Sequence, residues 1–235
     1  MPFSLQLSHA APASVDSPLL VIILPQDPSL DAAVRAVDTP LAGAIQRSIT
    51  RRDFRGGRDE TMLFVGGDTG AQRVLLVGRG SATLTRAVAR RAAAIAARQA
   101  GKLGTGAMHV LIVDADADAI EGLALGAAAG SWAYPDLQTQ PPEKERRARL
   151  ESVTVLGADT DAVRAGFAAG AAVAEGQAIA KRLGMMPGNV CTPDTFVEVG
   201  REIAARHGMT ITVLGRAEME QEKMGSFLCV AQGTP

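Results

Sequence analysis

The sequence has few aromatic residues, and this shortage limits how its core can pack. Phenylalanine, tryptophan and tyrosine make up 3% of the 235 residues, whereas hydrophobic residues as a whole reach 47%. A chain of this length and apolar content can bury a large core and is not expected to be disordered. Because alanine takes the place of the rings, we expect the helices to pack closely through small side chains.

Net charge, cysteine and long apolar runs are also scarce. The formal net charge is -1, so no overall field favours nucleic acid or a membrane surface. The two cysteines, Cys191 and Cys229, lack a CxxC spacing and lie in apolar contexts, which is typical of reduced core thiols. No apolar run approaches the roughly 18 residues of a membrane-spanning helix, and residues 1–4 lack the basic start of a signal peptide. These absences favour a cytoplasmic protein with no membrane partner.

Motifs that would mark a catalytic or metal site are missing as well. The chain has three histidines, His9, His109 and His207, and contains no HExxH, no GxSxG and no carboxylate and histidine cluster with metal-ligand spacing. The alternating carboxylates at 114–118 lack the glycine and the glutamate of a calcium loop, so we interpret them as caps of the following helix. The sequence therefore predicts no catalytic residue and no metal ligand in this chain.

Short apolar runs rich in β-branched residues alternate with alanine-rich helical patterns over the first two thirds of the chain. Such an alternation predicts an α/β fold with a largely parallel sheet and helices on its faces. The predicted strands are residues 19–24, 61–65, 73–77, 108–113 and 152–156, and the predicted helices are residues 30–37, 41–50, 84–100, 117–134 and 161–183.

The pattern changes near Gly184, where GMMPGNVCTP concentrates proline and glycine and predicts a turn. Thr192 is placed to cap a new helix, which should begin at Pro193 and end before Gly208. After it, the sequence predicts strands at 209–214 and 227–231 around a short helix at 216–221. We therefore expect an incomplete β-α-β unit that starts a second α/β domain. The expected boundaries are 1–158 for the first domain, 159–188 for a linking helix and turn, and 189–235 for the second.

One glycine-rich turn is a candidate site for a phosphate or a nucleotide. Gly78, Gly80 and Ser81 belong to a turn, residues 78–83, that follows a predicted strand and opens a predicted helix, as in a dinucleotide-binding loop. However, Thr83 occupies the third glycine position, and no Asp or Glu occurs between residues 71 and 113. A tight strand-to-helix turn is therefore the simpler interpretation of both glycines.

A basic segment is the second candidate site. Arg51, Arg52, Arg55 and Arg58 surround Phe54 and are followed by flexible glycines. Contact with the phosphates of a nucleic acid is one hypothesis for this segment. A solvated loop between a helix and a strand is the simpler alternative.

Residues 175–235 resemble the leucyl aminopeptidase family, also called cytosol aminopeptidases, at the passage that joins the two domains of that family. The resemblance rests on LGMMPGNVCTPDTF, on the helix that follows it, and on MTITVLGRAEMEQEKMGSFLCVAQGT. Upstream, RVLLVGRG at 73–80 and EGLALG at 121–126 are similar to a strand and a helix of the family. Met185 departs from the pattern, because the family usually has Asn at this position.

The resemblance implies a macro-like N-terminal α/β domain, a linking helix and the start of a catalytic domain. Enzymes of the family release N-terminal amino acids from peptide substrates with two divalent metal ions, Mn or Zn, and form homo-hexamers. Their metal ligands come after the part that this chain matches, so we expect the chain to be a truncated portion that is inactive by itself. The alternatives are a module that binds ADP-ribose or DNA, or a domain that only supports structure and assembly.

Overall fold

The computed structural model of the chain describes residues 3–66, 70–139, 141–230 and 232. These residues form two compact units that divide between Ala180 and Lys181.

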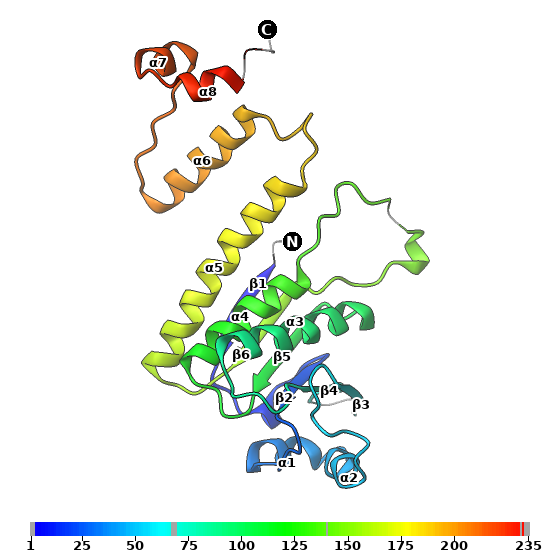
Figure 1. Ribbon diagram of the computed structural model, residues 1–235. Coiled ribbons are helices and arrows are strands. Elements are labelled where there is room, and N and C mark those ends of the chain that lie inside the picture. Colours follow the sequence, from blue (N-terminus) through cyan, green and yellow to red (C-terminus); the bar gives the residue numbers. More distant parts are fainter. Residues whose placement is uncertain (1–2, 67–69, 140, 231, 233–235) are drawn as a thin grey trace. The chain divides into compact units, whose positions relative to one another are not determined.

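A six-stranded sheet forms the centre of the first unit (Figure 1). Its strand order is β1-β6-β5-β2-β4-β3, and every neighbouring pair is parallel except β3 and β4, which are antiparallel. The strands are β1 (Ser4–Ser8), β2 (Leu20–Leu24), β3 (Thr61–Val65), β4 (Arg73–Gly78), β5 (Ala107–Ile112) and β6 (Ser152–Leu156). The predicted fold class, a mostly parallel mixed sheet flanked by helices, is confirmed. Strand β1 is absent from the sequence prediction, because three of the five residues of SLQLS are polar and the strand pairs only with the distant β6.

Helices cover both faces of the sheet. Successive residues of the central strand β2 point to opposite faces, and both sets are buried beneath helices. Val21 and Ile23 pack with the alanines of α3 and the apolar side chains of α4, while Leu20 and Ile22 pack with α1, α2 and Phe54. The helices of this unit are α1 (Ala32–Asp38), α2 (Ala44–Thr50), α3 (Arg86–Leu103), α4 (Ala117–Ser131) and most of α5 (Asp161–Met185), with the 3-10 turns η1 (Pro12–Ser14) and η2 (Glu143–Glu145).

Small residues allow the helices on one side of the sheet to approach one another. Gly122, Gly126 and Gly130 recur every fourth residue along α4, so they share one face of that helix. A Cβ atom at residue 126 would lie 2.1 Å from the carbonyl oxygen of Arg90 in α3, and the other two glycines face the α3 backbone in the same way. The expectation of close packing through small side chains is confirmed here.

The second unit consists of helices. They are α6 (Pro193–His207), α7 (Arg216–Gln221) and α8 (Gly225–Val230). The predicted start of α6 is confirmed: the Thr192 hydroxyl accepts a hydrogen bond from the Thr195 amide, and Gly208 ends the helix in the left-handed conformation.

The predicted strands of the second unit are wrong. Residues 209–214 form no strand, and Phe227–Val230 belong to α8; residue 231, the last of that predicted strand, lies outside the described residues. A strand obtains its backbone hydrogen bonds from a neighbouring strand, and the described residues of this unit include none. A local helix instead pairs the Leu228 amide with the Met224 carbonyl. The incomplete β-α-β unit is therefore not formed.

Candidate functional site

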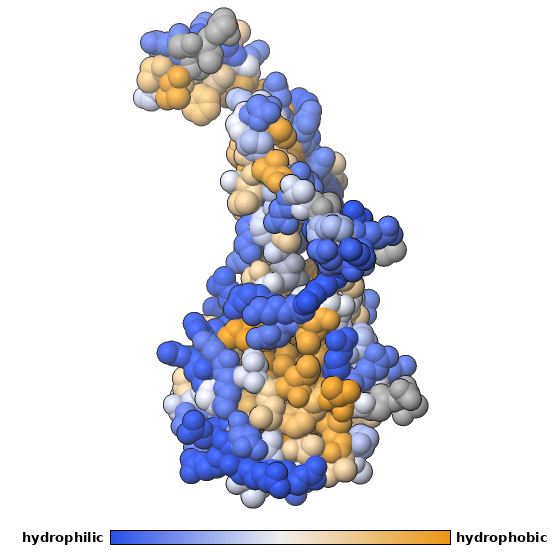
Figure 2. Space-filling view, turned by 90° about the vertical axis from the view of Figure 1, so that its right-hand side faces the viewer, coloured by the Kyte–Doolittle hydropathy of each residue, from blue (hydrophilic) through white to orange (hydrophobic). Residues whose placement is uncertain are grey.

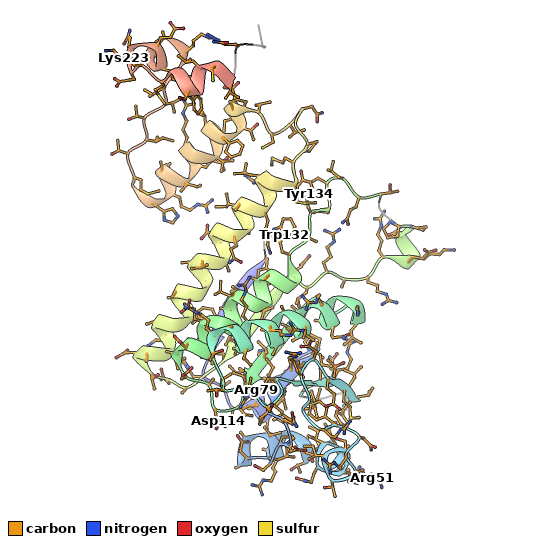
Figure 3. All side chains as sticks on the ribbon, viewed as in Figure 1. Arg51, Arg79, Asp114, Trp132, Tyr134 and Lys223 are labelled. Atoms are coloured by element: carbon orange, nitrogen blue, oxygen red, sulfur yellow. The ribbon has the colours of Figure 1, made fainter. Side chains whose placement is uncertain are left out.

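The carboxyl ends of β2, β4 and β5 meet at one edge of the sheet. In the strand order, β2 and β5 are neighbours. The chain continues from β2 to β3, at one end of this order, and from β5 to β6, in the other direction. In α/β proteins, ligands bind outside the carboxyl ends of strands at such a point of reversal. Figure 3 shows Arg79, which follows β4, and Asp114, which follows β5, on this edge. Any ligand site in the first unit is therefore expected here.

The glycine-rich turn lies on this edge, but backbone contacts explain its glycines. The Gly78 amide donates to the Glu60 carbonyl at 2.8 Å, and the Gly80 amide donates to the Gly56 carbonyl at 3.0 Å. A Cβ at residue 78 would lie 2.0 Å from the carbonyl oxygen of Gly57. Gly80 also has a φ of 78°, which favours glycine. Both glycines thus let the preceding loop lie against the end of β4.

The turn does not open a helix, so this part of the prediction is wrong. Residues 81–85 separate Gly80 from α3, whose N-cap is Thr85. The Thr85 hydroxyl accepts a hydrogen bond from the Val88 amide. Ser81 is exposed and lies outside the first turn of α3. A phosphate held at Ser81 would therefore not gain from the helix dipole.

The basic segment lies next to the glycine turn, so the structure brings the two candidate sites together. Arg51, Arg52, Arg55 and Arg58 are all exposed. Phe54, between them, is 0% exposed and packs in the core, so it is not available to stack on a base.

Two acidic residues hold the loop that carries these arginines. The Glu60 carboxylate accepts hydrogen bonds from the amides of Arg55 and Gly57, the latter at 2.8 Å. The Asp27 Oδ1 atom lies 3.7 Å from Nη2 of Arg52. These contacts therefore hold the backbone of the loop in place, while its arginine side chains remain exposed.

Arg79 is a residue of this edge that the sequence prediction did not single out. Its Nη1 donates to the Ala82 carbonyl at 2.7 Å, whereas its Nε is buried and has no hydrogen-bond partner among the described residues. A buried donor without a partner costs free energy and marks a position where a water or an anion would be stabilised. The sequence signal that could have pointed to Arg79 is its place between two glycines directly after a predicted strand.

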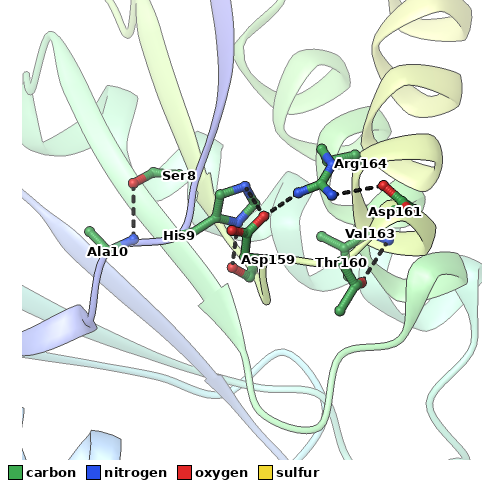
Figure 4. Close-up of polar contacts among 9 residues, drawn as sticks. Ser8, His9, Ala10, Asp159, Thr160, Asp161, Val163 and Arg164 are labelled. Carbon is green, nitrogen blue, oxygen red and sulfur yellow. Dashed lines mark hydrogen bonds and ion pairs between the residues drawn. The ribbon is translucent and has the colours of Figure 1, made fainter.

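A second polar cluster lies beyond the ends of β1 and β6 (Figure 4). His9 faces the Gly157 carbonyl at 3.0 Å through Nδ1 and the Asp159 carboxylate at 3.5 Å through Nε2. Arg164 contacts Asp159 and also donates to Asp161 at 2.7 Å. The cluster joins the end of β1 to the first turn of α5. Since Asp159 and Asp161 are largely exposed, it contributes to positioning more than to stability.

Among the shifted pKa values in the first unit, those of His109 and Asp59 arise from structural contacts. Burial lowers the pKa of His109, whose Nδ1 lies 2.9 Å from the buried Ser17 hydroxyl. The hydrogen bond from Arg91 lowers the pKa of the Asp59 carboxyl group. Ser17 is 1% exposed and its hydroxyl donates its proton to the Leu19 carbonyl at 2.9 Å, so it cannot act on a substrate beside His109. Asp59 is paired with an arginine, so neither contact is a catalytic arrangement. The role of His109 in this unit is therefore structural.

The residues that the structure describes contain no group of three or more His, Cys, Asp or Glu side chains that could hold a metal ion. Both cysteines are free. Cys191 is half-buried, whereas Cys229 is exposed and its thiol faces the Ser226 carbonyl, so the prediction that Cys229 is a core residue is wrong.

Comparison with known proteins resolves the family. Residues 20–141 match the N-terminal domain of the cytosol aminopeptidase family, and residues 178–235 match its catalytic domain. The chain belongs to the cytosol aminopeptidase family. The resemblance of residues 175–235, and the weaker one upstream, is confirmed.

Relatives of this chain are named probable cytosol aminopeptidases. A probable cytosol aminopeptidase of Ralstonia nicotianae is 34% identical over 235 residues, which cover 93% of this chain and 46% of that protein. A probable cytosol aminopeptidase of Geotalea uraniireducens is 34% identical over 84% of this chain and 41% of its own length. The chain thus spans about half the length of the curated relatives it matches.

Solved structures show the same fold. A tomato leucine aminopeptidase mutant aligns with 100% of this chain and 49% of its own chain, with a TM-score of 0.80 and 21% identity. The bottromycin maturation enzyme BotP aligns with 87% of this chain and 41% of its own, with a TM-score of 0.65 and 24% identity. In the described part of the chain, no helix combines the length and apolar character needed to cross a membrane.

Proposed function

We propose that this chain is the amino-terminal part of a metal-dependent leucyl aminopeptidase that releases N-terminal amino acids from peptides in the cytoplasm. The observation that carries the proposal is the order of the two family matches: an N-terminal domain at 20–141 precedes a catalytic-domain match at 178–235. The 34% identity to a probable cytosol aminopeptidase over 93% of this chain supports it.

The 235-residue chain alone is expected to be inactive. The resemblance to the family implies that peptide hydrolysis requires two divalent ions, Mn or Zn, which would polarise the peptide carbonyl and activate a water. The described residues offer no group of carboxylates, histidines or cysteines that fits even one such ion. No step of the reaction is therefore assigned to a residue of this chain. Its part in the enzyme is to supply the N-terminal α/β domain and the first helices of the catalytic domain.

A chimera tests this proposal directly. The chain would be joined at Pro235 to the remaining catalytic portion of the Ralstonia nicotianae relative and assayed with a leucine chromogenic amide and added Mn or Zn. We expect turnover by the chimera and none by the 235-residue chain. The catalytic portion of the relative without this chain is the matched control. Robust turnover by the chain alone would refute its inactivity, and a folded but inactive chimera would refute the assigned role.

Assembly is a second part of the proposal. The resemblance implies a homo-hexamer for the whole enzyme, so the chimera should form hexamers while the isolated chain forms a monomer or a small oligomer. Light scattering distinguishes these states. A stable hexamer of the 235-residue chain would contradict the expectation.

Binding of DNA or of ADP-ribose remains a hypothesis for the edge that carries Arg51 to Arg58 and Gly78 to Ser81. The backbone contacts of Gly78 and Gly80 favour neither ligand, because they explain both glycines. Titration with duplex DNA across a salt series tests the first, since phosphate contacts weaken steeply with salt. Calorimetry with ADP-ribose tests the second.

A further inference from the structure

Strand β3 is a terminal strand of the sheet, and no strand among the residues that the structure describes pairs with its outer edge. It pairs with β4 in an antiparallel register, in which the Gly66 amide donates to Gln72 and the Gly78 amide donates to the Glu60 carbonyl. In such a ladder, alternate residues direct their backbone groups to the partner strand. The amides and carbonyls of Thr61, Leu63 and Val65 therefore point away from β4.

The same alternate residues of β3 expose apolar side chains. Leu63 is 40% exposed and Val65 is 78% exposed, whereas Met62 and Phe64 pack against the core on the α1 and α2 side. Figure 2, which views the side of the molecule where β3 lies in Figure 1, shows a hydrophobic band among hydrophilic residues on the first unit. The strand contains no charged residue and no proline, which are the residues that usually protect an edge.

A row of cations lies alongside this edge. The cations are Arg91, Arg98 and Lys102. Together with Ile95 they are spaced by four, three and four residues, so all of them share one face of α3. This face is turned toward β3, because Arg91 forms an ion pair with Asp59, two residues before the strand. The charge of Arg98 also lowers the pKa of Asp59.

Within the segment that contains α3, the charged residues are all basic. Residues 71–113 contain seven Arg and Lys residues and no Asp or Glu, so the α3 segment supplies no acidic neighbour for these cations. Arg91 is neutralised by Asp59. No ion pair within the described residues involves Arg98 or Lys102, and both are exposed.

We propose that the outer edge of β3, with the exposed cations Arg98 and Lys102 on α3, is a docking site for an extended acidic peptide segment of a partner protein. The segment adds to the sheet as a seventh strand and pairs with the outward backbone groups of Thr61, Leu63 and Val65. Its alternate acidic side chains lie on the face that Leu63 and Val65 share with α3, so that their aliphatic stems cover these two residues and their carboxylates face the cations of α3. Its apolar side chains lie on the opposite face, beside Met62 and Phe64. This inference concerns a surface of the first unit and does not depend on peptidase activity.

A second copy of this chain fits the edge less well than an acidic segment. Pairing of two β3 edges would join two sheets and place the α3 rows of both copies on the same face. The joined face would then carry cations from both α3 helices, and the α3 segments contain no acidic residue to separate them. Like charges brought together oppose association, especially at low salt.

Three labelled peptides test the proposal by fluorescence anisotropy with the 235-residue chain. The probe alternates Glu and Val, the second peptide replaces Glu by Lys, and the third is the acidic probe with alternate backbone nitrogens methylated. We expect the acidic probe to bind at least about tenfold more tightly than either control, because one lacks the charge and the other the backbone donors. High salt should weaken its binding.

Variants of the chain locate the site. Leu63→Pro removes an outward amide, which an edge strand tolerates, and should weaken the acidic probe by about tenfold or more. Arg98→Glu should weaken it severalfold. Arg51→Glu makes the same change in charge at the end of α2 and should leave the affinity unchanged.

Each outcome decides the proposal. Equal binding of the acidic and basic peptides, or affinities unchanged in both Leu63→Pro and Arg98→Glu, would overturn it. A β3-dependent dimer in light scattering without binding of the acidic probe would assign the edge to a second copy and overturn it too. If circular dichroism shows that Leu63→Pro unfolds, the comparison of Arg98→Glu with Arg51→Glu decides.

Discussion

Replacing Gly126 by alanine should destabilise the first unit, although alanine is the better helix former. In an exposed helix, this change stabilises by about 1 kcal/mol. At residue 126 the new Cβ would lie 2.1 Å from the Arg90 carbonyl oxygen and 2.8 Å from the Ala93 Cβ. Overpacking of a core costs about 1–3 kcal/mol, and the obstacle here is backbone that cannot rotate away. Taking the upper value, we expect the free energy of unfolding to fall by about 2 kcal/mol.

Urea unfolding followed through Trp132 measures this change. Trp132 is the only tryptophan and directly follows α4, so its fluorescence reports on the helix that carries the substitution. Gly176→Ala in α5 is the matched control, because a Cβ there would meet no atom within 4 Å. This variant should gain about 0.5–1 kcal/mol. In thermal unfolding, Gly126→Ala should lower Tm by roughly 4–8 °C.

The opposite signs of the two substitutions are the decisive result. If Gly126→Ala stabilised the protein as much as Gly176→Ala does, helix propensity would dominate at both positions. The close approach of α3 and α4 would then not be the reason for the glycines in α4, and the reasoning would be refuted.

Three further changes test individual contacts. Phe54→Ala should lower the free energy of unfolding by about 3–5 kcal/mol in urea titrations, because the ring is fully buried beneath the arginine loop. A loss below about 1 kcal/mol would contradict the conclusion that Phe54 attaches this loop to the core. The pKa of His109 is lowered by burial, so its contribution to stability is complete above the unfolded value of about 6.5 and is lost as the pH falls below it. His109→Gln should therefore flatten the dependence of stability on pH below about 6.5, and an unchanged slope there would exclude His109 as its source. Thr192→Ala should cost about 1 kcal/mol of local stability in α6, seen as faster amide exchange at its first turn, and Thr192→Ser should restore most of it.

The elements with a strong local signal were predicted well. The run LVIIL of β2 is buried at every position, and its length and flanking proline identify a strand without any knowledge of its neighbours. The start of α6 follows from Thr192 and Pro193 alone, since the cap is formed by residues within one turn. These features depend on sequence neighbours, which a sequence displays directly.

The elements that failed depend on partners distant in sequence. The polar strand β1 exists because its backbone pairs with β6, from Ser4 with Ser152 to Ser8 with Leu156. The apolar run at Phe227 has the opposite fate: without a neighbouring strand among the described residues, it forms the helix α8. Strand propensity describes how a segment suits a sheet, not whether the sheet is there.

The α/β class, the family and the lack of a recognisable catalytic motif follow from local patterns and residue types, so the amino-acid sequence is enough to establish them. The roles of the glycines, in contrast, depend on contacts in the folded protein. Gly78 and Gly80 admit the loop at Gly56 and Gly57, and the glycines of α4 admit the α3 backbone. The tertiary structure also placed the arginine loop beside the glycine turn and the cations of α3 beside the outer edge of β3. Such contacts join residues far apart in the chain, so their distances are set by packing and cannot be inferred from spacing along the sequence.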